Sequence, residues 1–211
     1  MPLLLVSPPA EEPVSLAEAK LHLRVDFSDD DALITALITA ARAAAETITG
    51  RQLVTARWKL VLDSFPGPSL MGVPAGTPFS LPGHAILIPK CPIQSLVSIQ
   101  YLDMASTWQV MPATDYTVDL ACEPARITPV FGKIWPITLP QIGAVTVTFD
   151  AGYGAASTVP EGLKSWIKLR VGSLYAHREE IALLNRGSIQ SLPFVDGLLD
   201  PFRMTDRKST R

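Results

Sequence analysis

Basic residues, cysteine and aromatic residues are all scarce in this chain of 211 residues. Eighteen lysines and arginines against twenty acidic residues give a formal net charge of −2, whereas a dedicated nucleic-acid-binding protein has a strong basic excess. The two cysteines, Cys91 and Cys122, lie far apart, as expected of reduced thiols in a cytoplasmic protein. The N-terminal apolar run LLLV is too short for a signal sequence or a membrane span. We therefore expect no membrane partner and no sequence-specific binding of DNA.

Motifs that carry chemistry are also missing from the sequence. It contains no G-x-S-x-G, no Walker loop, no H-E-x-x-H and no C-x-x-C. The three histidines, His22, His84 and His177, fall in different predicted elements, and the aspartates at 26 and 29–31 lack the glycine and distal glutamate of a calcium loop. We therefore expect no catalytic residue, no cofactor and no metal site. A hydrolase centred on His84 or His177 remains an alternative, because residues distant in sequence can converge in the fold.

The strongest positive signal is the helical periodicity of residues 28–50, SDDDALITALITAARAAAETITG. A narrow polar stripe is formed by Thr35, Thr39, Arg42, Glu46 and Thr49. One apolar flank consists of Leu33, Leu37, Ala41, Ala44 and Ile48, and the other of Ile34, Ile38 and Ala45. Such a helix must be covered on more than one side, by its own chain or by a neighbouring subunit. Ser28 is the expected N-terminal cap, and Gly50 the left-handed stop.

Two further helices are predicted around this one. Ser15 and Glu18 have the spacing of a capping box, which indicates a helix from Leu16 to about Arg24 and hence an αα-hairpin. Pro160 suits the first turn of a later helix. The apolar stripe of that helix comprises Leu163, Trp166, Ile167, Val171 and Leu174.

The middle of the chain alternates with a period of two and is rich in proline, which indicates β structure with many turns. A first strand is expected over Val54–Leu62. Further strands are expected at Ala85–Ile88, Ser95–Leu102, Gln109–Val110, Tyr116–Leu120, Arg126–Val130 and Ala144–Asp150. The segment Asp63–Gly83 has no periodicity, so we expect a mobile or functional loop there. Trp108 and Trp135 could be core residues or a stacking platform, and the latter would make a β-sandwich ligand-binding module.

These elements predict an α+β fold in which a small helical bundle, the αα-hairpin plus a C-terminal helix, carries an inserted antiparallel sheet or sandwich. The predicted organisation is a helical body from residues 1–52 and 158–185, a β insertion from 53–157, and a C-terminal docking tail from 186–211.

The order of the elements resembles the head–tail connector, or head-completion adaptor, family of long-tailed bacteriophages, prophages and gene transfer agents. The resemblance rests on PVSLAEAKLHLRVD, DDDALITALITAARAAAETITGR, TARWKLVLDSFP, DYTVDLACEPARI, VTVTFDAGYGAASTVPEGLK and LPFVDGLLDPFR. It implies a non-enzymatic virion protein, assembled in the host cytoplasm, that forms a dodecameric ring at the neck. It also implies contacts with the portal and with a neck stopper or tail-completion protein, while DNA passes through the ring without sequence-specific binding.

The same reading assigns residues to three roles. The interface and core of the long helix are expected to comprise Leu33, Ile34, Leu37, Ile38, Ala41 and Ala45, and the core of the later helix Leu163, Trp166, Ile167 and Leu174. Portal docking is expected of Phe194, Leu198, Leu199, Phe202 and Arg203. Gly197 and Pro201 make a long independent helix there unfavourable. In the alternative, the last segment folds back on the subunit's own helices.

Overall fold

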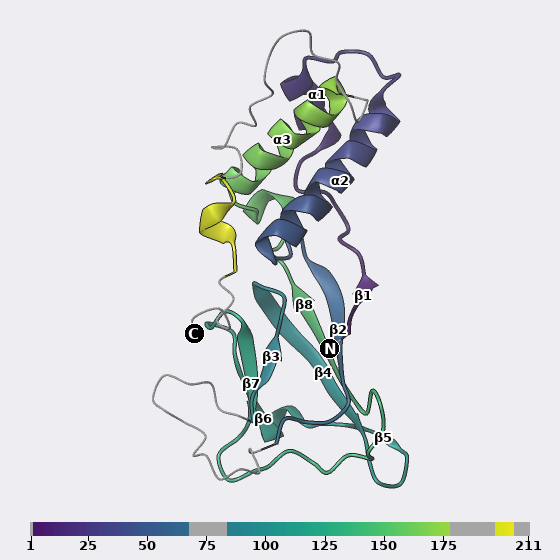
Figure 1. Ribbon diagram of the computed structural model, residues 1–211, viewed down its shortest axis with the longest axis vertical. Helices are drawn as coiled ribbons and strands as arrows, with labels where there is room; N and C mark the ends of the chain where they lie inside the picture. Colours follow the sequence, from purple (N-terminus) through teal and green to yellow (C-terminus); the bar gives the residue numbers. More distant parts are fainter. Residues whose placement is uncertain (1, 68–83, 178–196, 205–211) are drawn as a thin grey trace, which may run out of the picture. The chain divides into compact units, whose positions relative to one another are not determined.

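The computed structural model describes residues 2–67, 84–177 and 197–204 (Figure 1). The chain divides into two compact units, a β unit of Met1–Pro9 and Thr55–Gly152 and a helical unit of Ala10–Val54 and Tyr153–Arg211. Three α-helices, three short 3₁₀-helices and two antiparallel sheets form the described elements. The predicted α+β class is therefore confirmed.

The helical unit contains α1 (Leu16–Leu23), α2 (Asp31–Thr49) and α3 (Glu161–Ala176) (Figure 1). The predicted capping box is present: the Ser15 hydroxyl accepts the Glu18 N–H at 3.2 Å, and the Glu18 carboxylate accepts the Ser15 N–H at 2.8 Å. Arg24 closes α1 in the left-handed conformation, with φ 58°. A short link then leads into α2, as the hairpin prediction requires.

The start of α2 differs from the expectation. Its cap position is Asp30 rather than Ser28, and the Asp30 side chain makes no capping hydrogen bond. The carboxylates here serve other contacts, because Asp31 accepts a hydrogen bond from Lys20 Nζ at 2.6 Å and Asp30 accepts one from the Tyr175 hydroxyl. The acidic run thus ties α2 to α1 and α3. At the other end, Gly50 has φ 73°, which confirms the predicted left-handed stop.

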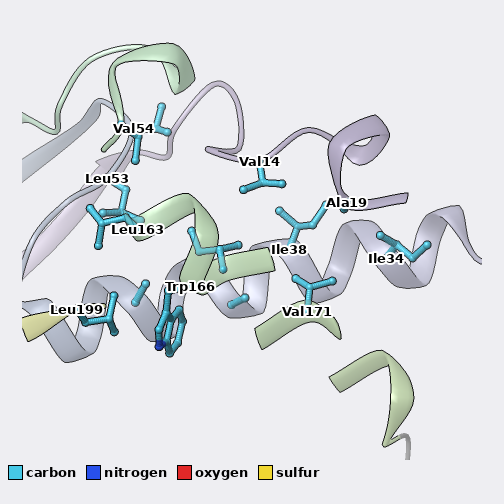
Figure 2. Packing of buried hydrophobic residues seen from close by; sticks show 14 of the residues in the cluster. Val14, Ala19, Ile34, Ile38, Leu53, Val54, Leu163, Trp166, Val171 and Leu199 are labelled. Atoms are coloured by element: carbon cyan, nitrogen blue, oxygen red, sulfur yellow. The ribbon is translucent and has the colours of Figure 1, made fainter. Parts of the chain in front are cut away.

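One apolar core holds the three helices together (Figure 2). Its buried members are Val14, Ala19, Val25, Ile34, Ile38, Ala41, Ala45, Leu53, Val54, Val159, Leu163, Trp166, Ile167, Val171 and Leu199. Figure 2 shows Ile34 and Ile38 of α2 beside Ala19 of α1 and Val171 of α3. Leu163, Trp166 and Ile167 are therefore core residues, whereas Leu174 is only half-buried.

The polar stripe of α2 is exposed at Thr35 and Thr39, whereas Arg42 is half-buried and Glu46 is buried beneath two chain segments. The Glu46 Oε1 atom accepts hydrogen bonds from the Gln52 side chain at 2.6 Å and from the Leu53 N–H at 3.1 Å. Its Oε2 atom accepts from Arg42 at 2.8 Å, and Arg42 donates at 2.7 Å to Glu12. This chain of contacts, the Glu46 network, joins the segment before α1, the middle of α2 and the link to the first strand of the insertion.

The β unit contains a five-stranded sheet in the order β1-β2-β8-β4-β5 and a three-stranded sheet in the order β3-β7-β6. Every neighbouring pair is antiparallel. The strands are β1 (Leu3–Ser7), β2 (Ala56–Leu62), β3 (Ile86–Ile88), β4 (Ile93–Leu102), β5 (Trp108–Val110), β6 (Tyr116–Asp119), β7 (Ala125–Pro129) and β8 (Val145–Ala151) (Figure 1). A second apolar core, to which both sheets contribute, confirms the predicted sandwich.

The N-terminal strand β1 corrects the predicted organisation. Residues 1–52 were all assigned to the helical body, yet Leu3 pairs with Leu60 and Leu5 with Trp58. Met1–Pro9 consequently belong to the β unit. The run LLLVS was not predicted as a strand because it shows no alternation of polar and apolar residues and proline follows it closely.

Part of the predicted Asp63–Gly83 loop is structured. Phe65 is buried, stacks on Trp135 with ring centroids 4.7 Å apart, and contributes to the β core. The Asp63 carboxylate accepts the Gly143 N–H at 2.9 Å. The remainder, residues 68–83, lies outside the described residues.

Glu46→Gln tests the Glu46 network. The substitution removes the ion pair with Arg42 and turns an amide N–H₂ group toward the guanidinium, so we expect a loss of about 2–4 kcal/mol in unfolding free energy. Chemical denaturation measures it. The matched control is Glu161→Gln, whose partner Lys164 is held at 3.1 Å while the Glu161 side chain is 77% exposed; it should cost less than about 1 kcal/mol. Equal effects of the two substitutions would contradict this assignment.

A second prediction concerns pH and the β unit. Hydrogen bonding to the Arg57 guanidinium, at 2.8 Å, holds the pKa of Asp150 below its ordinary value of 3.8. A lowered pKa in the folded state stabilises the fold above that ordinary value, and this contribution disappears as pH falls through the folded pKa. Asp150→Asn should therefore lower Tm slightly at neutral pH, and the gap to wild type should close below pH 3.8. A gap that persists in acid would show that the charge is not responsible.

Candidate assembly interfaces

The described residues include no group of three or more His, Cys, Asp or Glu side chains that could hold a metal ion. Hydrogen bonds shift the pKa values of two surface carboxyl groups: the Ser15 N–H lowers the pKa of Glu18, and the Thr107 N–H lowers that of Asp103. The surface is of interest for what it can contact.

The outer face of α2 is the first candidate interface. It consists of Leu33, Ala36, Ala40, Ala43, Thr47 and Ile48, all of them exposed. Leu33 is 37% and Ile48 42% exposed, whereas Ile34, Ile38, Ala41 and Ala45 on the opposite side are buried, and Leu37 is half-buried. The predicted interface and core set is thus divided between two faces. The outer face carries no charge, and its alanines permit close approach of another surface.

By length and composition α2 could also cross a membrane. Its inner face, however, packs in the helical core, and Arg42 and Glu46 lie within the Glu46 network. These contacts are those of a core helix, which passes the same test of length and composition.

The C-terminal segment, residues 197–204, is folded against the helical unit. Leu199 is completely buried in the core, and Leu198 and Phe202 pack against it. Arg51 donates to the Phe202 carbonyl at 2.6 Å, and the Met204 N–H donates to the Thr49 carbonyl at 3.0 Å. For these residues the fold-back alternative is the observed one.

Leu199 is therefore a core residue in this structure and not a free docking anchor. Arg203 is exposed and pairs with Asp200 at 3.1 Å. Phe194 lies outside the described residues. The predicted docking role cannot be read from the spacing of apolar residues alone, because the same spacing suits packing on the subunit's own helices.

The second candidate interface is the connection between β7 and β8, residues 131–142, which we call the apolar loop. Its side chains Phe131, Ile134, Ile137 and Ile142 are each at least 78% exposed. The loop is nevertheless held firmly: Trp135 stacks on Phe65 and donates to the His84 carbonyl at 2.6 Å, and the Leu139 N–H donates to Leu102 at 3.0 Å.

Sequence reasoning missed the apolar loop because the spacing of Phe131, Ile134, Ile137 and Ile142 follows neither the helical nor the strand period. It did leave open the role of Trp135, which the structure places inside the sandwich as an anchor. Trp108 is exposed on β5. The two tryptophans therefore do not form a stacking platform.

Part of the sequence matches a known protein family. Residues 13–81 match a family model described as "Phage gp6-like head-tail connector protein". The resemblance to head–tail connectors is confirmed. The matched region contains α1, α2 and β2. No curated protein matches the sequence.

Solved structures with the same fold extend the resemblance to the whole chain. A chain described under "Neck of empty GTA particle computed with C6 symmetry" has 22% identity and a TM-score of 0.76, with 100% of both chains covered. One from "Virion of native gene transfer agent (GTA) particle" has 22% identity and a TM-score of 0.74, covering 98% of this chain and 97% of that chain. One from "Neck of native GTA particle computed with C12 symmetry" has 22% identity and a TM-score of 0.72, again with 100% of both chains covered. The shared fold includes both units.

Leu199→Ala tests the role of the C-terminal segment. Removing a completely buried leucine side chain should cost about 2–4 kcal/mol of unfolding free energy through lost transfer energy and a residual cavity. The control is Leu21→Ala on α1, where the side chain is 81% exposed and little should change. A Leu199→Ala variant as stable as wild type would indicate that the segment is only loosely attached in solution.

Proposed function

We propose that this protein is a structural head–tail connector of a phage-like particle. It forms a ring in the neck below the portal, extends the channel for DNA, and seats the next neck or tail protein. It performs no catalysis. The observation that carries this proposal is the uncharged, apolar outer face of α2, exposed on a helix whose other face is already buried.

A ring explains why that face is left open. Identical subunits in a ring touch through two different surfaces, one on each side, and the contact closes on itself. An alanine-rich helix face lets a neighbouring element approach closely, and the flanking Leu33 and Ile48 supply apolar area that is otherwise in contact with water. The neck structures with the same fold, solved with C6 and C12 symmetry, support such a ring. They also support a place for this chain in the neck of a particle.

Docking to the portal is assigned to the basic residues of the C-terminal region. Arg203 lies at the surface, and Arg207, Lys208 and Arg211 follow it in sequence. These charges steer the subunit toward an acidic surface, while Leu199 secures their attachment to the helical core. A near-neutral overall charge suits a channel through which DNA slides.

Binding of the next neck or tail protein is assigned to the apolar loop. Its anchored backbone presents Phe131, Ile134 and Ile137 in a fixed arrangement, so binding requires little additional ordering. Lys133, the loop's charged residue, is paired with Asp115. This interaction should consequently depend little on salt concentration.

Replacing both Leu33 and Ile48 with Asp tests the ring. Both side chains are partly exposed in the monomer, so Tm should change little, whereas unpaired charges buried in a dry contact with the neighbouring subunit should prevent association. Mass measured by light scattering, alone and with purified portal, is the readout. The matched control is Leu21→Asp on α1. If the double variant assembles like wild type, the outer face of α2 is not part of the interface. The proposal then loses its main support.

A further inference from the structure

The five-stranded sheet has two uncovered edges, β1 and β5. Among the described residues neither strand has a partner on its outer side. Leu4 and Leu5 on β1 are about half exposed, and Trp108 and Val110 on β5 are more so. Consecutive residues of a strand point to opposite faces, so exposure of both Leu4 and Leu5 means that β1 is uncovered on both faces.

The outer face of this sheet is apolar at its edges and polar in its middle. The register places Leu4 opposite Lys59, Lys59 opposite Thr148, and Thr148 opposite Ser98. It places Val110 opposite Gln100, two residues beyond Ser98 on the same face of β4. Between the edges, Arg57, Asp150 and Ser95 form a hydrogen-bonded polar group. Leu4 and Val110 thus lie on the same face of the sheet, at opposite edges, and are offset by only two residues along the strand direction.

These edges carry none of the charged or proline residues that usually discourage pairing, although β5 is only three residues long and the register of β1 shifts between Leu5 and Ser7. Sheet edges in monomeric proteins are normally blocked by lysine, proline or an inward-pointing charge. The β1 sequence LLLVS and the β5 sequence WQV contain none of these. Uncharged apolar edges of this kind need to be covered by another molecule. They carry no positive charge that would favour nucleic acid or an anionic membrane as the partner.

We propose that the cover is a second copy of this chain: the β1 edge of one subunit packs against the β5 edge of the next, so that Leu4 lies beside Trp108 and Val110. A closed ring needs two different surfaces on opposite sides of each subunit, and the two edges of one sheet satisfy that condition. The inference rests on the proposed ring and adds to it a belt of joined sheets. The two-residue offset between Leu4 and Val110 is accommodated by tilting the strands relative to the ring axis, as in closed barrels.

Disulfide trapping tests the contact directly. The variant carries Leu4→Cys and Val110→Cys in a Cys122→Ser background, with Cys91 left in place because it is buried. Within one subunit β2, β8 and β4 separate the two new cysteines, so they are about 19 Å apart, well beyond disulfide reach. Mild oxidation should therefore produce a ladder of covalent oligomers on a non-reducing gel. Each single-cysteine variant should give at most dimers.

The trapping is done both on the purified protein and on assembled particles that contain the variant. A ladder in either sample supports the inference. Absence of a ladder in both, or cross-linking of either cysteine to a different particle protein, overturns it. Particles that incorporate the variant without any ladder would leave the connector proposal standing while refuting the sheet contact, so the two failures are distinguishable.

A second variant, Leu4→Ser with Val110→Ser, checks the contact without oxidation. Both side chains are exposed, so Tm should be unchanged, and the concentration for half-maximal association should rise about tenfold through loss of apolar contact area. The control is Leu21→Ser on α1 of the helical unit. Unchanged association of the double variant would contradict the inference.

Discussion

The helical unit depends on the hydrogen bonds that the buried carboxylate of Glu46 accepts. One oxygen accepts from Gln52 and from the backbone of Leu53, and the other accepts from Arg42, which in turn holds Glu12. A buried charge is tolerated only when its hydrogen bonds are completed. All of these partners must therefore be in place in the folded helical unit. The network thereby sets where the chain enters α1 and where it leaves α2.

Sequence periodicity predicted most of the fold because each signal was local. The Ser15–Glu18 capping box, the stop at Gly50 and the alternation in β2 all depend on residues within a few positions of one another. The burial of Glu46 was not predicted, since two of its partners, Gln52 and Leu53, lie after α2, and its partner Arg42 is held by Glu12 from the segment before α1. Leu199 shows the same limit: its spacing fitted docking to another protein equally well, and only the fold reveals that its site lies on the subunit itself.

In the proposed ring, the two units contribute different kinds of surface. The helical unit offers a face rich in alanine, which suits close approach of a neighbouring subunit. The β unit offers projecting side chains on the apolar loop, where Trp135 supplies the rigidity that an irregular segment lacks by itself. The helix face is uncharged and the loop's Lys133 is paired with Asp115, so the selectivity proposed for these surfaces comes from shape and from the exclusion of charged competitors.

The strand β1 has a consequence for how the protein is made and how its parts can be exchanged. The residues Ala56 and Ala151 at the two ends of the insertion are direct partners, so the insertion leaves and rejoins the chain at adjacent points. Its sheet nevertheless takes an edge strand from the very start of the chain. On the ribosome, Leu3–Ser7 emerges long before β2 and stays without a partner while both N-terminal helices are synthesised. Transplanting the insertion into another connector would therefore require moving the N-terminal strand with it.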